Sequence, residues 1–185
     1  MVSVELKNYQ SSTTVRTKIR RAVWNLVAFS FRLSPRRFFV YRRFMLRMFG
    51  AKMGDRSYVY PTTRIWDPAH LEMGSDSSIA DFVDCYNIVK ITIGSNCTIS
   101  QYAYLCTGNH DITLPTMPLK AEPISIEDGS WICARAFIGP GVTVHKAAVV
   151  AACAVVVKDI DAWSIVGGNP AKVIGQRVLK DNQSK

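Results

Sequence analysis

The sequence lacks a long apolar run, a signal-peptide pattern and any CxxC pair of cysteines. Its best apolar run, residues 22–31, is interrupted by Asn25 and Ser30 and is too short to span a bilayer, which takes about 20 residues. The five cysteines form an odd set, which favours a reducing compartment, so we expect a cytoplasmic protein. Cys85 and Cys97 fall in the apolar and small-residue columns described below, which predicts packed thiols rather than redox or metal chemistry.

Acidic residues are almost missing from the first fifty positions. Residues 1–50 hold 11 Lys or Arg and one acid, Glu5, whereas residues 51–185 hold 12 Lys or Arg and 13 Asp or Glu. The net charge of +9 therefore comes from the N-terminal arm, and the rest of the chain is close to neutral. A nearly neutral body argues against binding to nucleic acid, so we predict no nucleic-acid partner.

A six-residue period organises the chain from Ile126 to Val156. Aliphatic residues recur at every sixth position, and a small or slim residue follows four positions after each of the first five: Ile126, Ile132, Ile138, Val144, Val150 and Val156, then Ser130, Ala136, Val142, Ala148 and Ala154. Neither a helix nor a half-buried strand generates a period of six. The pattern predicts a parallel β-solenoid in which three short faces make one triangular coil.

The same sixes extend towards the N-terminus. An apolar residue followed by glycine recurs at a spacing of 20, in Met53-Gly54, Met73-Gly74 and Ile93-Gly94. Each of these pairs begins three six-residue units. The rhythm stops after Leu105, in a stretch that contains Asn109-His110-Asp111 and several prolines. Because a long interruption in a strict repeat is usually functional, we predict an extruded loop over residues 106–125. The solenoid is expected over residues 51–166, followed over residues 167–185 by a turn, a short helix or strand, and a tail.

The N-terminal arm, residues 1–50, has the pattern of two amphipathic helices. The first begins near Val15 and carries one aliphatic stripe: Val15, Ile19, Ala22, Val23, Leu26 and Val27. The second is predicted to begin with Ser34 as N-cap and Pro35 in its first turn, with an apolar face made of Phe38, Tyr41, Met45 and Met48. Two compatible roles stay open: the arm caps the solenoid or packs on another subunit, or residues 15–50 lie on an anionic membrane surface.

A series of segments follows the loop in a fixed order: Trp131-Ile132, Gly139-Pro140-Gly141-Val142-Thr143, Val155-Val156-Val157-Lys158-Asp159-Ile160 and Gly168-Asn169-Pro170-Ala171-Lys172-Val173-Ile174. Together with the sixes and Asn109-His110-Asp111, this series resembles the hexapeptide-repeat O-acetyltransferases over about residues 51–177. The chain is similar to the galactoside and maltose acetyltransferases. It most resembles those of colanic acid and other exopolysaccharides, whose basic, aromatic extension and Tyr86-Asn87 and Tyr104-Leu105-Cys106-Thr107 segments it shares.

The resemblance implies both a fold and a reaction. The fold is expected to be a left-handed parallel β-helix, assembled as a homotrimer with active sites between neighbouring subunits. The reaction is expected to be direct transfer of acetyl from acetyl-CoA to a sugar hydroxyl within a ternary complex, without a metal ion. The implied acceptor is a sugar or a lipid-linked saccharide of cell-surface polysaccharide synthesis, with the arm at the inner face of the membrane.

The reaction needs a base that takes the proton of the attacking hydroxyl, and histidine has suitable basicity at neutral pH. His70 lies near a coil corner and His145 follows an inward-facing residue, so only His110 is on the extruded loop. His110 also matches the family's catalytic histidine and is predicted to be the general base. The sequence leaves open whether Asp111 or a carboxylate from elsewhere, such as Asp84, orients its ring.

Further contacts are implied residue by residue. Asp84, Tyr86 and Asn87 are expected near the acceptor sugar. Contacts with CoA are expected from small residues along a coil edge, an aromatic side chain and several cations: Trp131, Ala134, Ala152, Val157, Lys158, Lys172 and Arg177. Simpler roles compete with these, namely a polar turn for Asn87, packing for the tryptophan and solvated surface positions for the cations. Departures from the family pattern at individual positions weaken single contacts and leave the register intact: Cys133, His145-Lys146, Ala151 and Val157.

Three alternatives belong beside this hypothesis. A serine or amino-sugar N-acetyltransferase could use the same scaffold and would transfer acetyl to an amine. A non-catalytic solenoid scaffold would make no use of His110. A solenoid carbonic anhydrase binds zinc through three histidines, two of them close in sequence, whereas the three histidines of this chain are far apart.

Overall fold

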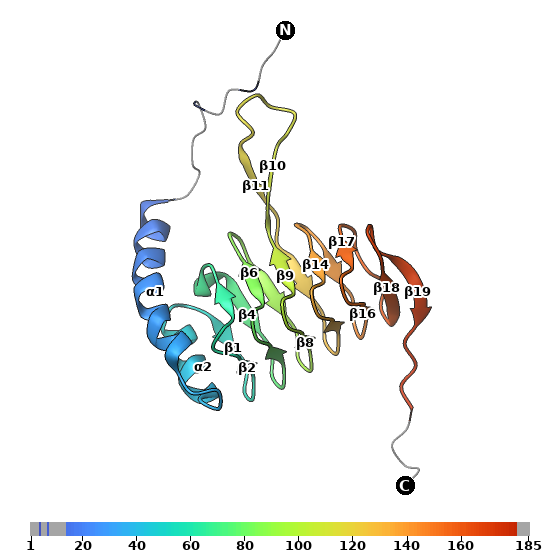
Figure 1. Cartoon of the computed structure of the whole chain (residues 1–185), viewed down its shortest axis with the longest axis horizontal. Coiled ribbons are helices and arrows are strands. Elements are labelled where there is room, and N and C mark those ends of the chain that lie inside the picture. Colours follow the sequence, from blue (N-terminus) through green and yellow to red (C-terminus); the bar gives the residue numbers. More distant parts are fainter. Residues whose placement is uncertain (1–3, 5–6, 8–13, 181–185) are drawn as a thin grey trace.

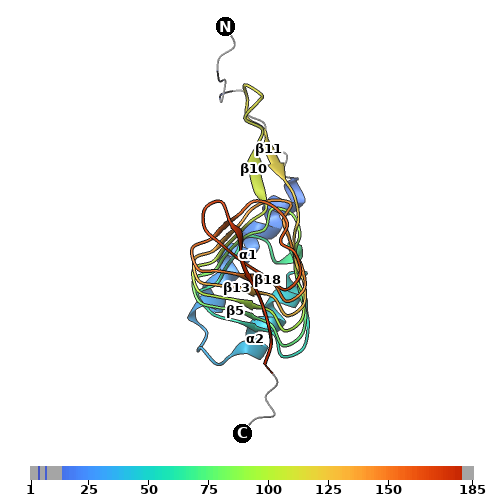
Figure 2. The same ribbon diagram turned by 90° about the vertical axis from the view of Figure 1, so that its right-hand side faces the viewer.

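Short strands wind into a left-handed parallel β-helix in the computed structural model, which describes residues 4, 7 and 14–180 (Figure 1). Two helices lie at the N-terminal end of the stack, and a long hairpin projects from its side. Figure 2 looks along the stack and shows the coils superposed, with the hairpin leaving on one side. The fold predicted from the six-residue period is confirmed.

Three sheets form the faces of the β-helix. The first contains β1 (Lys52–Met53), β4 (Leu71–Met73), β7 (Ile91–Ile93), β12 (Ile124–Ile126) and β15 (Thr143–Val144). The second contains β2 (Tyr58–Val59), β5 (Ser78–Ile79), β8 (Thr98–Ile99), β13 (Trp131–Ile132), β16 (Val149–Val150), β18 (Ser164–Gly167) and β19 (Lys172–Gln176). The third contains β3 (Arg64–Ile65), β6 (Asp84–Tyr86), β9 (Tyr104–Cys106), β14 (Phe137–Ile138) and β17 (Val155–Val156). A short 3₁₀ turn, η2 (Pro68–His70), fills one corner.

The core is a narrow column of side chains from the predicted inward positions, all of which are buried. Stacked coils place these residues in register, so that Ile79 pairs with Ile99 and Ile99 with Ile132. Cys85 and Cys97 are buried and reduced as expected, and burial raises the pKa of both thiols. One inward side chain recurs on each face at every sixth position, which explains why the sequence repeats in sixes. The first sheet buries a second side chain in β4, β7 and β12, namely Leu71, Ile91 and Ile124.

Close approach of successive coils explains the glycine at the start of each long coil. A Cβ built on Gly74 would lie 2.6 Å from the carbonyl carbon of Gly94 and 2.6 Å from the backbone nitrogen of Ser95. Gly54 stands in the same relation to Gly74, with the carbonyl carbon of that glycine 2.6 Å away. These contacts are with backbone atoms, which cannot rotate away, so a larger residue would force the coils apart.

The N-terminal arm covers the open end of the β-helix with α1 (Val15–Leu33) and α2 (Phe39–Met48), as the capping hypothesis predicts (Figure 1). Trp24, Phe31 and Leu46 are buried in the same core as the first coils. Trp24 also donates its indole N–H to the carbonyl of Ile65 at 2.8 Å.

The faces that the helices bury differ from the predicted stripe. The buried residues of α1 are Trp24, Ala28 and Phe31, whereas the aliphatic stripe points away from the coils, with Leu26 80% exposed. Helix α1 is therefore apolar on two sides, and the sequence pattern identified the side that stays exposed.

The predicted start of the second helix at Ser34 is wrong. Ser34 instead ends α1, because a residue before proline avoids the helical conformation, and its hydroxyl donates to the carbonyl of Phe31. The buried Arg42 stabilises the turn that follows. Its guanidinium donates hydrogen bonds to Ser34 Oγ at 2.8 Å and to the carbonyls of Pro35 and Arg36 at 2.9 and 2.5 Å.

Two further elements complete the chain. The interruption in the repeat forms a hairpin of β10 (Gly108–His110) and β11 (Leu119–Ala121), which pair antiparallel (Figure 1). The C-terminal element, left open between helix and strand, is the strand β19 folded back on β18. Neither helix of the described chain has the length and apolar character needed to cross a bilayer.

Gly74→Ala tests the close packing of the coils. We expect the free energy of unfolding to fall by about 1–3 kcal/mol, because the new methyl group would meet backbone atoms of the next coil. Urea unfolding at a fixed protein concentration measures the change. The control is Gly175→Ala, where a Cβ would meet only Ile165 Cδ1 at 3.8 Å. Equal stability of the two variants would contradict the packing argument.

Candidate active site

His110 is the last residue of β10, on the hairpin that leaves the third sheet directly after β9. The base of the hairpin packs on the preceding coil: a Cβ on Gly108 would lie 2.7 Å from Ile88 Cδ1 and 3.0 Å from Tyr86 Cε1. A larger residue here would have to displace the ends of the Ile88 and Tyr86 side chains. The hairpin thus starts beside Tyr86 and carries His110 outward, where the side chain is exposed.

The imidazole of His110 is oriented by a residue of its own hairpin, in the loop just before β11. Its Nδ1 lies 2.7 Å from the carbonyl oxygen of Met117. Because a carbonyl oxygen can only accept a hydrogen bond, Nδ1 carries the proton in the neutral ring, and the basic lone pair is on Nε2. This arrangement prepares Nε2 to take a proton from a substrate.

Asp111 braces the hairpin. Its carboxylate accepts hydrogen bonds from the backbone N–H and hydroxyl of Thr113, at 3.0 and 2.6 Å, and pairs with Lys120 Nζ at 2.9 Å. These hydrogen bonds, first from Thr113 and then from Lys120, lower the pKa of Asp111 to about 2. The carboxylate therefore joins the two strands of the hairpin.

Asp84 and Tyr86 lie on the outward face of β6, next to the base of the hairpin. Asp84 Oδ2 is 3.4 Å from Arg64 Nη1, while Asp84 Oδ1 is buried and has no hydrogen-bond partner within residues 14–180. Burial raises the pKa of Asp84, and the neighbouring Arg64 opposes this only in part. Tyr86 meets Trp66 edge to face, with ring centroids 5.9 Å apart.

Asn87 occupies a different environment from Asp84 and Tyr86. It is fully buried, and its Oδ1 accepts from the backbone N–H groups of Trp66 and Asp67 at 3.1 and 3.0 Å. Its Nδ2 donates to the carbonyl of Asp67 at 2.7 Å. The whole amide is used to hold the corner of the preceding coil, which is the role of a polar turn residue.

The residues expected at CoA fall into four places. Val157, Lys158 and Lys172 line one groove of about 410 Å³ at the C-terminal end of the β-helix. Ala134 and Ala152 lie at the corner after the second sheet in successive coils, which are joined by the bond from Cys153 N–H to the carbonyl of Ala134 at 3.0 Å. This corner and the groove belong to the same last coils of the stack.

Trp131 and Arg177 lie apart from that groove. Trp131 is half-exposed on β13, where its indole N–H donates to Ser100 Oγ at 2.9 Å. Arg177 donates to the carbonyls of Gly129 and Ala147 at 2.7 and 3.1 Å, at the corner between the first and second sheets. Strand β19 carries Arg177 there because it runs back along β18.

Two parts of the site were missed in the sequence. The carbonyl of Met117 sets the proton position on His110, and Lys120 pairs with Asp111. Both lie within the interruption of the repeat, so their neighbourhood was recognisable, but only the pairing of His110 with Leu119 defines which residues face each other. Among the described residues, no group of three His, Cys, Asp or Glu is placed to hold a metal ion.

Asp84→Asn tests the burial of this carboxyl group. A raised pKa means that the folded state binds the proton more tightly than the unfolded state, whose pKa is about 3.9. Wild-type stability should therefore fall as the pH rises from about 4 through the folded-state pKa, and the asparagine variant should lack this loss. Urea unfolding between pH 4 and pH 7 measures the difference, with the exposed Asp161→Asn as control. A difference that does not change with pH would contradict the raised pKa.

Known proteins with similar sequences and structures are acetyltransferases. An Escherichia coli K12 protein named "Putative colanic acid biosynthesis acetyltransferase WcaF" is 39% identical over 155 residues, which cover 84% of this chain and 85% of that protein. No protein-family model matches the sequence.

Two solved structures share the fold. A hexapeptide-repeat acetyltransferase from Vibrio cholerae, solved with acetyl-CoA, is 25% identical with a TM-score of 0.82, covering 92% of this chain and 93% of that one. A maltose O-acetyltransferase from Clostridium difficile 630 is 23% identical with a TM-score of 0.81, covering 91% and 92%. This second likeness shows a shared fold alone. On its sequence similarity and its β-helical fold, the chain belongs to the hexapeptide-repeat acetyltransferases.

Proposed function

We propose that this protein transfers the acetyl group of acetyl-CoA to a sugar hydroxyl during synthesis of a cell-surface polysaccharide. The donor is supported by the acetyl-CoA complex of the Vibrio cholerae protein, and the acceptor class by the name of the Escherichia coli relative. The observation that carries the proposal is the hydrogen bond from His110 Nδ1 to the Met117 carbonyl, which leaves Nε2 as the basic nitrogen of an exposed ring.

The transfer is direct. His110 Nε2 takes the proton of the sugar hydroxyl while the oxygen attacks the thioester carbonyl carbon of acetyl-CoA. The tetrahedral intermediate then collapses, the carbon–sulfur bond breaks, and the imidazolium of His110 returns its proton to the leaving thiolate. The products are the acetyl ester and CoA with a free thiol, so each turnover releases one thiol.

CoA would lie along the last coils of the β-helix. Ala134 and Ala152 offer a corner with small side chains where the pantetheine arm can approach the backbone. Lys158 and Lys172 flank the groove of about 410 Å³ and would meet phosphate groups. Trp131, on the adjoining second sheet, would contact the same arm. Arg177 is not assigned to CoA, because its side chain already donates hydrogen bonds to two backbone carbonyls.

The acceptor would lie against Asp84 and Tyr86 at the base of the hairpin, with Asn87 shaping the coil corner beneath them. The hairpin extends well beyond the coils, so His110 needs a second surface to enclose a substrate (Figure 1). A homotrimer, in which a neighbouring subunit supplies that surface, meets this need.

His110→Ala tests the reaction and its base together. We expect kcat for a saccharide acceptor to fall by about 10²-fold or more, because general-base catalysis contributes roughly 10²–10⁴-fold. Release of free thiol from acetyl-CoA measures turnover with galactosides, glucosides, fucosides and lipid-linked saccharides. The matched control is His145→Ala, a histidine paired with Glu127 at a coil corner.

Three outcomes would count against the proposal. Unchanged turnover in His110→Ala would remove this residue as the base. Faster acetylation of amino sugars or serine than of hydroxyls would make the protein an N-acetyltransferase. A wild-type protein that binds no acetyl-CoA would be a scaffold.

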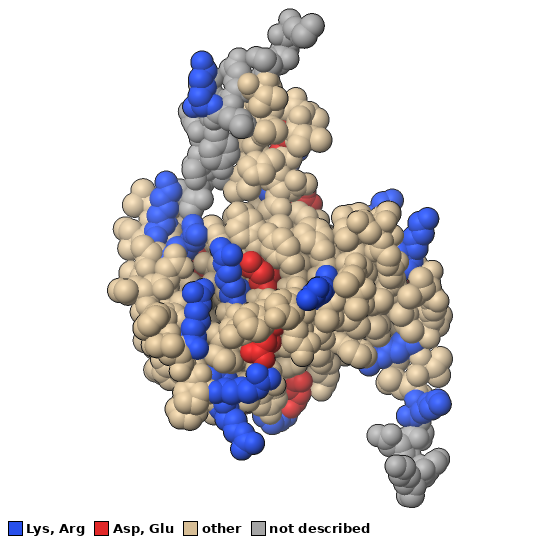
Figure 3. Space-filling view, viewed as in Figure 1, with Lys and Arg blue, Asp and Glu red and all other residues tan. Residues whose placement is uncertain are grey.

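Contact with an anionic membrane surface is the second part of the proposal. Both helices expose apolar residues, with Leu26 of the α1 stripe 80% and Val40 of α2 71% exposed. An apolar groove of about 490 Å³ runs between the helices beside Phe29, Leu33 and Phe38. Basic side chains gather over α1, α2 and the first coils in the view of Figure 3. Exposed apolar residues within a basic surface suit the boundary of an anionic bilayer.

Flotation with liposomes tests membrane contact. We expect the wild type to float with vesicles that contain phosphatidylglycerol at low salt, and to float less at high salt because the attraction is screened. The double variant Leu26→Glu, Phe29→Glu should stay at the bottom, since it places one charge on the apolar stripe and one in the apolar groove. The control Leu179→Glu changes an exposed residue at the other end of the chain. A wild type that stays at the bottom at low salt would remove the membrane proposal.

A further inference from the structure

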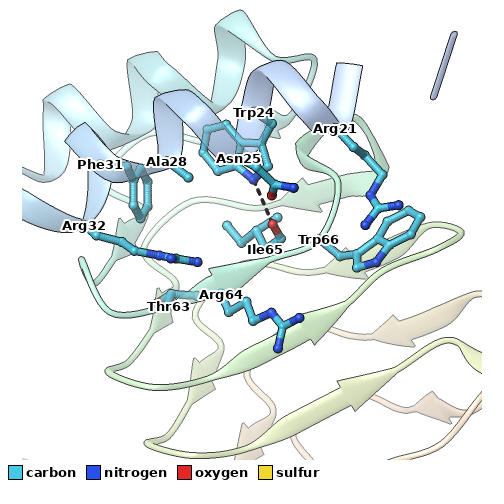
Figure 4. A pocket seen from close by; sticks show the side chains of 10 residues that line it. All are labelled: Arg21, Trp24, Asn25, Ala28, Phe31, Arg32, Thr63, Arg64, Ile65 and Trp66. Atoms are coloured by element: carbon cyan, nitrogen blue, oxygen red, sulfur yellow. Dashed lines mark hydrogen bonds between the residues drawn. The ribbon is translucent and has the colours of Figure 1, made fainter. Parts of the chain in front are cut away.

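A small polar cavity lies between α1 and β3, where the arm meets the first coil (Figure 4). Its volume is about 80 Å³, several times the roughly 10–15 Å³ that one water needs on the same measure. Arg21, Asn25 and Arg32 border it from the helix, and Arg64 and Trp66 border it from the strand. The cavity is therefore lined by three guanidinium groups and has room for a phosphate group.

Two of these arginines have unused hydrogen-bond donors. Arg21 lies flat over Trp66, with its Cζ 3.3 Å from the ring centroid, and its buried Nε has no hydrogen-bond partner within the described chain. Arg32 is exposed in the last turn of α1, and no described residue accepts a hydrogen bond from its side chain. Buried donors are normally satisfied, so the unpaired Nε of Arg21 points to a missing acceptor.

The nearby carboxylates do not neutralise the cavity. Asp67 is buried and held by Arg20, whose Nε is 3.0 Å from Asp67 Oδ1, and the same oxygen accepts from the N–H of Ala69 at 3.2 Å. Asp84 contacts Arg64 at the long distance of 3.4 Å. Asp67 also attracts Arg21, but four arginines, Arg20, Arg21, Arg32 and Arg64, face only these two carboxylates, which leaves an excess of positive charge around the cavity.

Guanidinium groups bind phosphate oxygens with paired N–H donors, which makes a phosphate ester or diphosphate the ligand that best fits this cavity. Water alone could fill the volume but could not balance the charge. The stacking of Arg21 on Trp66 fixes the plane of its guanidinium group, so the donors on its edge are already oriented.

The cavity is also connected to the proposed active site. Trp66 meets Tyr86, and Tyr86 packs against Gly108 at the start of the hairpin that carries His110. Strands β3, β6 and β9 are neighbours in the third sheet, so the cavity and the base of the hairpin are about 10 Å apart. A short saccharide can span that distance over the two aromatic rings.

We propose that the cavity bordered by Arg21, Arg32 and Arg64 binds the phosphate or diphosphate that joins the acceptor saccharide to its carrier. This inference rests on the proposed function and names the class of acceptor: a saccharide still linked through phosphate. The carrier is either a lipid or a nucleoside. A lipid carrier agrees with the exposed apolar stripe on the other side of α1.

Direct binding is the first test. Inorganic pyrophosphate is titrated into the full-length protein by calorimetry, with excess CoA present so that the phosphate sites of CoA are already filled. We expect the Kd to rise at least about 10-fold in Arg21→Gln, Arg32→Gln, since two charged donors are lost, and to stay unchanged in Arg16→Gln. Arg16 is on the same helix but outside the cavity. If the double variant does not fold, Arg32→Gln alone serves, because this side chain is exposed and should still weaken binding. Absence of binding by the wild type, or equal Kd values in all variants, would overturn the proposal.

Turnover separates the carriers. The KM of one saccharide is measured free, linked to a nucleoside diphosphate and linked to a short prenyl diphosphate. In the double variant we expect the KM of a diphosphate-linked acceptor, relative to the free saccharide, to rise at least about 10-fold. The carrier that shows this rise is the natural one, and an equal change for free and linked acceptors would overturn the proposal. If the wild type acetylates no saccharide, the proposed function fails, whereas the pyrophosphate titration still decides whether the cavity binds phosphate.

Discussion

Backbone hydrogen bonds between stacked coils hold this protein together, and they leave a narrow interior that holds only one or two strand side chains per face in each coil. Every inward position must then be aliphatic or small, as in the column Ile79, Ile99 and Ile132. The same stacking brings backbones so close at Gly74 that no side chain fits. A stack also has open ends, and an end coil with unpaired strands and an exposed core has to be covered.

The helices α1 and α2 cover the N-terminal end of the β-helix and stabilise the core, and α1 also borders the proposed phosphate site. Helix α1 closes the core with Trp24 and Phe31, and the buried Arg42 holds the connection between the two helices. The cover does not fit flush against β3, and the cavity that remains is lined by arginines that the coil does not neutralise. One helix therefore closes the core on one side and presents an apolar stripe on the other. This geometry is the basis for the proposed carrier-linked acceptor and the proposed membrane contact.

The proposed catalytic group depends on a break in the repeat. Coils that follow the six-residue rule place all outward side chains on flat faces, where a histidine would stay at the surface of a sheet. The hairpin lifts His110 off that surface, and the loop before its second strand supplies the Met117 carbonyl that determines which ring nitrogen is basic. Asp111 and Lys120 keep the two strands together. The hairpin is thus anchored in the rigid β-helix, directly after β9.

The sequence by itself determined the β-helix, its register and the position of the hairpin, because the narrow interior repeats one steric requirement at every sixth residue. It also made His110 the candidate base, since the loop that interrupts the repeat holds a single histidine. Only the tertiary structure decided which face of α1 is buried, because the helix is apolar on two sides and periodicity cannot choose between them. The tertiary structure also placed Arg177 apart from Lys158 and Lys172. It showed that the amide of Asn87 is hydrogen-bonded within a coil corner, and that Arg21, Arg32 and Arg64 border one cavity. These contacts join residues far apart in the chain, and no local pattern encodes the distance between them.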